Sequence, residues 1–319
     1  MVQALNEALR FCLREDPRVL LFGEDVGTLG GVFRVTDRLQ AEFGEDRVFD
    51  TPLAEAAIVG FGLGLSLARW RPVAEMQFDG FSYPALDQIF SHVAKYHFRS
   101  QGQLRAEMVI RIPYGGGIKG VEHHSESPET YYTHTAGLKV VVPSSPLDAY
   151  NLLVRSVRDP DPVIFLEPKS RYWAKESGQL TPDGDPIGKA RVVRAGRHAT
   201  LISWGGMVHR CLEAAEAAAE DGVELEVVDL RSLVPLDVGA ITESSVKTGR
   251  VVVVHEAPLT SGFGGEIVAR IMENAFDRLG APVLRVTGYD TPYPPALLED
   301  HYLPNVERIL VALDRSLKY

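Results

Sequence analysis

The clearest local pattern in the chain is DTPLAEAAIVGFGLGLSLARWRPVAEMQF, at residues 50–78. Thr51 and Pro52 begin a predicted helix over residues 52–68, because proline at the first helical position loses only an amide that lacks a partner anyway. A short apolar run at residues 72–78 follows this helix and predicts a strand. A helix that leads into a buried strand is typical of the βαβ units that build parallel sheets.

The same alternation of short apolar runs and longer amphipathic segments extends along the chain in both directions. Further strands are predicted at residues 19–23, 108–112, 138–142, 163–166, 198–203, 224–229, 250–255 and 282–286. Further helices are predicted at residues 83–100, 147–158, 207–221, 237–248, 264–279 and 304–317. The segment SGQLTPDGDPIG interrupts this alternation with turn-forming residues. We therefore expect an α/β protein of two doubly wound parallel-sheet domains, residues 1–175 and 191–319, with a linker at residues 176–190.

The composition excludes several classes of protein. The 319 residues include 33 Lys and Arg against 43 Asp and Glu, a formal charge of −10, and no basic run. An acidic chain of this kind is a poor binder of nucleic acids and of membrane surfaces. Cys12 and Cys211 lie far apart and in no metal-binding spacing, which is typical of free thiols in a reducing compartment. We expect a soluble cytoplasmic protein.

Common catalytic motifs are absent from the sequence. The glycine-rich segment GGGIKG at residues 115–120 does not match a phosphate-binding Walker loop. Gly60, Gly62 and Gly64 are spaced two apart inside a predicted helix, so they do not form a dinucleotide fingerprint. No Gly-x-Ser-x-Gly elbow or His-Glu-x-x-His motif occurs. These absences argue against proteases, kinases and simple Rossmann dehydrogenases.

Glu55 is a candidate catalytic residue. It is the only ionisable side chain between Leu53 and Ala68. A lone carboxylate on a buried helix is costly unless it is paired or protonated, and burial would raise its pKa so that it donates a hydrogen bond near neutral pH. The alternative is a solvated glutamate in the first turn, where the helix dipole favours a negative charge. Both interpretations are open from composition alone.

Two further segments follow predicted strands, where sites lie in this fold class. In VEHHSESPE, residues 121–129, the paired histidines after a glycine-rich loop suit proton transfer near neutral pH. The alternatives are a solvated loop or a helix cap, and a metal site is disfavoured because no third ligand stands at a regular spacing. In QFDGF, residues 77–81, Phe81 could stack on a flat heterocycle, although core packing is the commoner role of such a ring.

Seven motifs, in this order, resemble one known family. They are GEDVG (23–27), GGVFRVT (30–36), DTPLAE (50–55), EMQFDGF (75–81), YPALDQI (83–89), HHSESPE (123–129) and FLEPK (165–169). The chain resembles the beta subunit of the thiamine-diphosphate-dependent decarboxylase component of 2-oxo acid dehydrogenase complexes. HHSESPE and FLEPK are closer to the branched-chain type than to pyruvate enzymes.

The resemblance implies a fold and site residues. The first domain would be the pyrimidine-binding domain and the second a transketolase C-terminal-like domain. Glu55 matches the glutamate that hydrogen-bonds N1′ of the cofactor's aminopyrimidine. His124 matches the histidine that transfers protons while the acyl group passes to the lipoyl group of the dihydrolipoyl acyltransferase. Leu53, Gln77 and Phe81 match positions around the pyrimidine, and branched-chain relatives often carry tyrosine in place of Phe81.

The resemblance also implies partners. Members of this cofactor class anchor Mg²⁺ and the diphosphate with Gly-Asp-Gly, and the nearest segment here, Asp183-Gly184-Asp185, lies in the predicted linker. An alpha subunit would therefore hold Mg²⁺ in an α2β2 heterotetramer, with the helix of Gly60 and Gly64 at a subunit interface. The acyltransferase would dock on the C-terminal domain, and the substrate would be a 2-oxo acid.

Relatives also hold a structural potassium ion on backbone carbonyls. The matching positions are Ala106, Met108, Val109, Ser156, Asp159 and Asp161, with Pro160 inserted in the turn.

Two other interpretations of the chain's function are open. One is a beta subunit specific for pyruvate or acetoin, and the other is a non-catalytic scaffold that only binds partners. A scaffold would need neither Glu55 nor His124.

Overall fold

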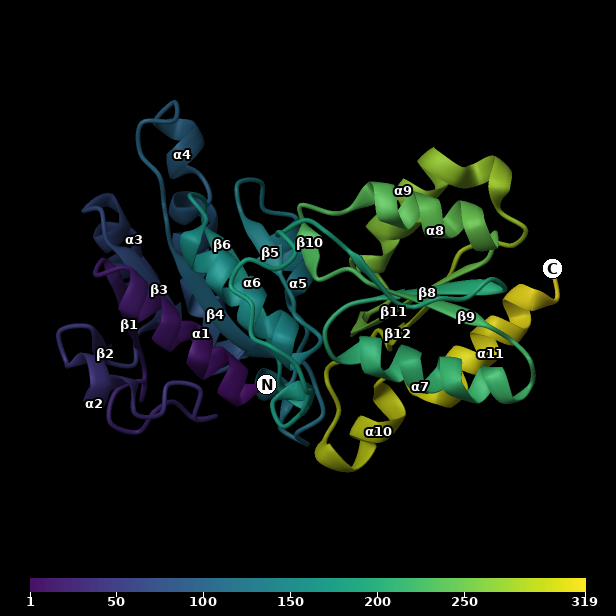
Figure 1. The fold of residues 1–319 in the computed structure, drawn as a ribbon, viewed down its shortest axis with the longest axis horizontal. Coiled ribbons are helices and arrows are strands. Elements are labelled where there is room, and N and C mark those ends of the chain that lie inside the picture. The colour runs from purple at the N-terminus through teal and green to yellow at the C-terminus, as the bar shows by residue number, and fades with distance from the viewer.

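The computed structural model describes residues 1–319, which form two mainly parallel sheets with helices packed on their faces (Figure 1). The first sheet has seven strands. In spatial order they are β10 (Ser232–Val234), β5 (Lys139–Val141), β6 (Val163–Pro168), β4 (Val109–Tyr114), β3 (Arg71–Glu75), β1 (Val19–Gly23) and β2 (Val48–Asp50). All neighbours are parallel except β10 and β5. The central strands are buried along their whole length, as parallel strands covered on both faces should be.

The second sheet has five strands. In spatial order they are β12 (Leu284–Gly288), β11 (Val251–Pro258), β8 (Ala199–Ser203), β9 (Leu225–Asp229) and β7 (Arg191–Arg194). Only β7 runs antiparallel to its neighbour. The α/β fold with two mainly parallel sheets is confirmed. The short strands β2, β7 and β10 were not predicted, since each lies at a sheet edge.

Helices cover both sheets. The longer ones are α1 (Val2–Glu15), α3 (Glu55–Leu67), α6 (Pro146–Arg158), α7 (Gly206–Glu220), α8 (Val238–Thr248), α9 (Gly264–Ala275) and α11 (Val306–Leu317). The shorter ones are α2 (Leu39–Phe43), α4 (Tyr96–Arg99), α5 (Glu129–Thr133), α10 (Glu299–Tyr302) and single turns at Gly80–Ala85, Glu122–His124, Lys169–Arg171, Phe276–Arg278 and Ala296–Leu298. Helix α1, which was not predicted, packs beside α6 (Figure 1). No helix has the length and apolar character that a membrane crossing requires.

The prediction of one helix over residues 83–100 is wrong. The segment contains a 3₁₀ turn at Gly80–Ala85, a π-helix at Gln88–Val93 and the short helix α4. Pro84 has no amide hydrogen to donate, which disfavours a regular helix through this point. Ile89 and Val93 still face the core, so the predicted apolar stripe is buried although the helix is irregular.

Strand pairing and a buried ion pair join the second half of the chain to the first sheet. Strand β10 comes from the second half of the chain and pairs with β5 of the first sheet. Arg231, just before β10, is fully buried, and its Nη2 lies 2.7 Å from Asp148 Oδ1 on α6. The second half of the chain is therefore anchored to the first sheet.

The carboxyl ends of three neighbouring strands lie together at one end of the first sheet. Strands β1, β3 and β4 are adjacent and parallel, so the loops that follow them emerge together. Arg111 on β4 links neighbouring strands through ion pairs, because its guanidinium lies 2.5 Å from Glu75 on β3 and 2.7 Å from Glu167 on β6. The predicted site residues belong to these loops and to the helix beside them.

Candidate active site

Glu55 is the first residue of α3, close to the carboxyl end of β1. Its side chain is only 9% exposed and makes no hydrogen bond or ion pair within the chain. Glu24, directly after β1, lies within electrostatic range. Burial raises the pKa of Glu24, and the negative charge of Glu55 raises it further. Glu24 Oε1 is buried without a hydrogen-bond partner, so two neighbouring carboxyl groups are available to a ligand.

Glu24 was not among the residues that the sequence predicted at the site. Glu24 is part of the GEDVG motif and directly follows β1, which is fully buried. Its position at the carboxyl end of this strand was the sequence signal that could have indicated a site residue.

Leu53 and one apolar face of α3 are exposed to solvent. Leu53 is 77% exposed and Phe61 is 50% exposed. A Cβ atom placed on Gly64 would meet nothing within 4 Å. Buried apolar area stabilises a folded chain, so an apolar helix face left in water is typical of an interaction surface. The helix predicted to lie at a subunit interface is therefore open to a neighbour at Gly64.

Gln77 and Phe81 lie in the loop after β3. Gln77 donates from Nε2 to Asp25 Oδ2 at 2.8 Å, which ties the loop after β3 to the loop after β1. Phe81 is half-buried, and its ring centroid lies 5.1 Å from that of His124. Phe78 packs closer, at 4.3 Å and edge-on to the same imidazole. Phe81 thus packs on the histidine pair at the site rather than in the core.

His124 lies in the Glu122–His124 turn, where the loop after β4 meets the loop after β3. Burial lowers its pKa, and the positive charges of His123 and Lys169 lower it further. The imidazole is therefore neutral near pH 7, so that one nitrogen can donate and the other can accept a proton. Its Nδ1 atom is buried and has no partner. This state is the one that general acid–base chemistry requires.

Buried charged residues hold the loop that carries His124. Asp79 Oδ2 accepts from the Glu126 amide at 2.8 Å, and Asp79 Oδ1 accepts from Lys169 Nζ at 2.6 Å. From the second half of the chain, Glu256 accepts from the Gly116 amide at 2.8 Å. Glu299 accepts from the Lys119 amide at 3.1 Å. Lys169 is the last residue of the FLEPK motif, and the sequence alone gave no sign of its contact with Asp79.

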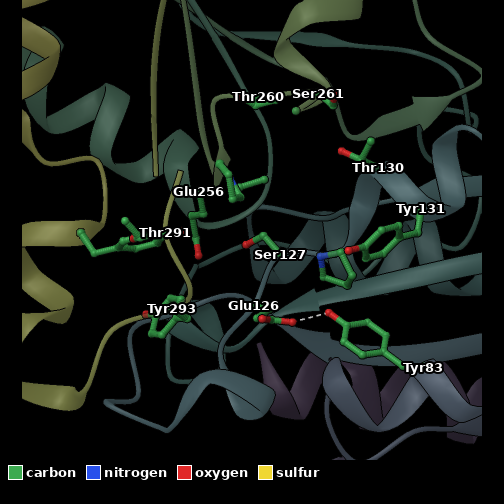
Figure 2. Close-up of a pocket in the computed structure, with 15 residues that line it drawn as sticks. Tyr83, Glu126, Ser127, Thr130, Tyr131, Glu256, Thr260, Ser261, Thr291 and Tyr293 are labelled. Carbon is green, nitrogen blue, oxygen red and sulfur yellow. Dashed lines mark hydrogen bonds between the residues drawn. The ribbon is translucent and has the colours of Figure 1, made fainter. Parts of the chain in front are cut away.

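A cavity of about 260 Å³ adjoins this loop. It lies between the first domain, at Glu126 and Ser127, and the loops after β11 and β12. Figure 2 shows the Tyr83 hydroxyl directed at the Glu126 carboxylate, to which it donates a hydrogen bond. Glu256 and Ser127 direct their oxygen atoms toward the same space. Polar groups from both halves of the chain therefore line this cavity.

The two segments predicted to hold potassium are neighbours in the structure. Met108 and the segment before β6 adjoin, since the Val163 amide donates to the Met108 carbonyl at 3.0 Å. Asp159 and Asp161 both face Lys139, whose Nζ lies 2.6 Å from Asp159 Oδ1. Lys139 already supplies a positive charge to these carboxylates, so a bound cation would depend on backbone carbonyls.

The chain and its fold are similar to known proteins. Residues 1–174 match the family model "Transketolase, pyrimidine binding domain", and residues 188–309 match "Transketolase, C-terminal domain". The chain is 54% identical to the pyruvate dehydrogenase E1 component subunit beta of Leifsonia xyli, over all of this chain and 95% of that one. It is 52% identical to the 3-methyl-2-oxobutanoate dehydrogenase subunit beta of Mycobacterium tuberculosis, over all of this chain and 92% of that one.

A solved structure shares the fold. It is described as a split-gene transketolase in the form of an inactive beta4 tetramer, with a TM-score of 0.80 and 23% identity over 99% of this chain and 97% of the other. The fold alone follows from that similarity, whereas the identities above 50% span whole chains. The chain therefore belongs to the family of beta subunits of the E1 component of the thiamine-diphosphate-dependent 2-oxo acid dehydrogenases.

Proposed function

We propose that the chain is the beta subunit of a branched-chain 2-oxo acid dehydrogenase. With an alpha subunit it would carry out oxidative decarboxylation of 2-oxo acids and reductive acylation of the lipoyl group of an acyltransferase. The observation that carries the proposal is the position of Glu55 and His124 beside the carboxyl ends of β1, β3 and β4. Glu55 is only 9% exposed, and burial lowers the pKa of His124, which favours its neutral form.

The residues present fit thiamine diphosphate at its aminopyrimidine. The Glu55 carboxyl group makes no hydrogen bond within the chain, so it is free to bind a ligand. Glu55 would hold the proton shared with N1′, and Leu53, Gln77 and Phe81 would surround the ring. When bound, the cofactor supplies the carbon nucleophile and the electron sink for decarboxylation. Mg²⁺ would be held mainly by the alpha subunit.

His124 would transfer the proton during acyl transfer. We expect His124→Ala to lower the rate of reductive acylation of a lipoyl domain about 100-fold, the contribution of a positioned acid–base group. Decarboxylation measured with an artificial electron acceptor should change less than about threefold, because that reaction bypasses the lipoyl group. His209→Ala, on the exposed side of α7, is the control and should change neither rate. Equal losses in both assays would remove His124 from this role.

The proposed preference for branched-chain substrates is inferred from the HHSESPE and FLEPK motifs, which resemble the branched-chain type. On the reconstituted enzyme we expect at least one of the three branched 2-oxo acids to exceed pyruvate in kcat/KM by about tenfold, since one or two methylenes in an apolar pocket supply that much. The same assay includes 2-oxobutyrate and acetoin as further substrates. A preference for pyruvate or acetoin would favour the alternative complexes. The absence of any 2-oxo acid turnover in the full assembly would favour a scaffold.

The assembly would be an α2β2 heterotetramer. The exposed apolar face of α3 supports a subunit interface, because covering Leu53 and Phe61 would bury apolar area and close the site over Glu55. The C-terminal domain would dock the acyltransferase. In this proposal the chain divides into a domain of residues 1–175, a linker at residues 176–190 and a domain of residues 191–319.

A potassium ion near Met108 and Asp159 would stabilise the start of β4 and β6. The candidate carbonyls are those of Ala106, Met108, Val109, Ser156, Asp159 and Asp161. We expect a higher melting temperature in potassium chloride than in sodium chloride of the same ionic strength, because an ion that binds only the folded state stabilises it. Equal melting temperatures would contradict a potassium site.

A further inference from the structure

The ion pair of Asp79 and Lys169 joins two loops of the first domain. Lys169 Nζ lies 2.6 Å from Asp79 Oδ1, and both side chains are completely buried. Asp79 follows β3, and Lys169 follows β6, 90 positions later in the sequence. The Coulomb attraction of a buried pair only roughly offsets the desolvation free energy of its two charges. Stability alone is therefore a weak explanation for this pair.

The second oxygen of Asp79 reaches the histidine loop. Asp79 Oδ2 accepts from the Glu126 amide at 2.8 Å, two residues after His124. At the next position, a Cβ atom on Gly80 would lie 2.6 Å from the carbonyl oxygen of His123, so the two backbones are in direct contact. The loop that carries Asp79 thus lies against the loop that carries His124.

The same loop supplies the aromatic rings around His124. Phe78 and Phe81 flank Asp79 in the sequence and both pack edge-on against the imidazole. The Lys169 ammonium lies 5.7 Å from the Phe78 ring centroid and also donates to the Pro113 carbonyl at 3.4 Å. Displacement of Asp79 would therefore move both the backbone of His124 and the rings that orient its side chain.

We propose that Asp79 and Lys169 are positioning residues that hold the His124 imidazole in place for proton transfer. Asp79 acts through the Glu126 amide and through the flanking phenylalanines. Lys169 acts by fixing the Asp79 carboxylate. This inference rests on the role proposed above for His124 in reductive acylation.

The test uses the reconstituted alpha–beta enzyme with thiamine diphosphate and Mg²⁺. We expect Asp79→Ala to slow reductive acylation of a lipoyl domain about tenfold or more, while decarboxylation with an artificial acceptor changes less than about threefold. Asp79→Asn keeps an oxygen that can accept from the Glu126 amide, so it should recover part of the loss. Lys169→Met should slow reductive acylation selectively, to about the same extent as Asp79→Ala. The matched control is Glu226→Gln, which removes a buried carboxylate paired with Lys247 in the second sheet.

A second readout is hydrogen–deuterium exchange of residues 115–129 in the same complexes. Exchange in this segment should be faster in Asp79→Ala than in the unmodified protein, and unchanged in Glu226→Gln. Equal losses in both reactions for Asp79→Ala, or unchanged exchange, would overturn the positioning role. His124→Ala distinguishes failure of the role proposed for His124 from failure of the positioning role alone. A selective loss in His124→Ala without one in Asp79→Ala overturns the positioning role alone, and no selective loss in His124→Ala overturns both.

Discussion

Glu55→Gln should abolish proton exchange at C2 of bound thiamine diphosphate while the subunits still assemble. Glutamine has nearly the same shape as glutamate but cannot give or take the proton at N1′, so the exchange rate should fall by at least about 100-fold. The chain itself should tolerate the change. Glu55 has no partner within the chain, so the free energy of unfolding should change by less than about 1 kcal/mol. Exchange is followed by NMR after mixing with deuterium oxide.

The control for this prediction is Glu266→Gln. Glu266 occupies the first turn of α9, as Glu55 does in α3, but α9 packs on the second sheet and Glu266 pairs with Arg270. Its replacement should leave C2 exchange unchanged. Exchange near the normal rate in Glu55→Gln would show that another group activates the cofactor, and Glu24 would then be the first candidate because it is the neighbouring carboxyl group.

Long buried strands were predictable from the sequence because each is a continuous apolar run. The strands that escaped prediction are short, and tertiary contacts rather than local pattern place them. Strand β10 has only three residues and exists because it pairs with β5, far away in the sequence. Helix 83–100 was predicted from its apolar stripe, but Pro84 and the π-helix at Gln88–Val93 interrupt it. Periodicity reports which face is buried more reliably than it reports regular helix geometry.

The grouping of the predicted site residues could be inferred from the sequence to the extent that these residues follow strands. Glu55, Gln77 and His124 each stand near a strand end, and parallel topology brings those ends to one edge. The pair of Asp79 and Lys169 was not predictable, because a single aspartate and a single lysine 90 positions apart carry no local signal. Their relation exists only once β3, β4 and β6 are aligned.

The chain should be inactive without its partner, an effect as large as that of Glu55→Gln. Leu53 stands next to the glutamate's helix and is 77% exposed, so the region around Glu55 is open on one side. An open site leaves water in contact with the reacting groups and weakens every electrostatic interaction there. The sequence also lacks the Gly-Asp-Gly motif that binds the diphosphate through Mg²⁺ in this cofactor class. We therefore expect a second subunit to cover and complete the site.

Release of carbon dioxide from 2-oxo acids tests this account most directly. The purified chain, the purified alpha subunit and their mixture are each assayed with thiamine diphosphate, Mg²⁺ and an artificial electron acceptor. Only the mixture should release carbon dioxide, and the Glu55→Gln mixture should assemble without releasing it. Carbon dioxide release by the isolated chain, at a rate comparable to that of the mixture, would contradict a site divided between two subunits.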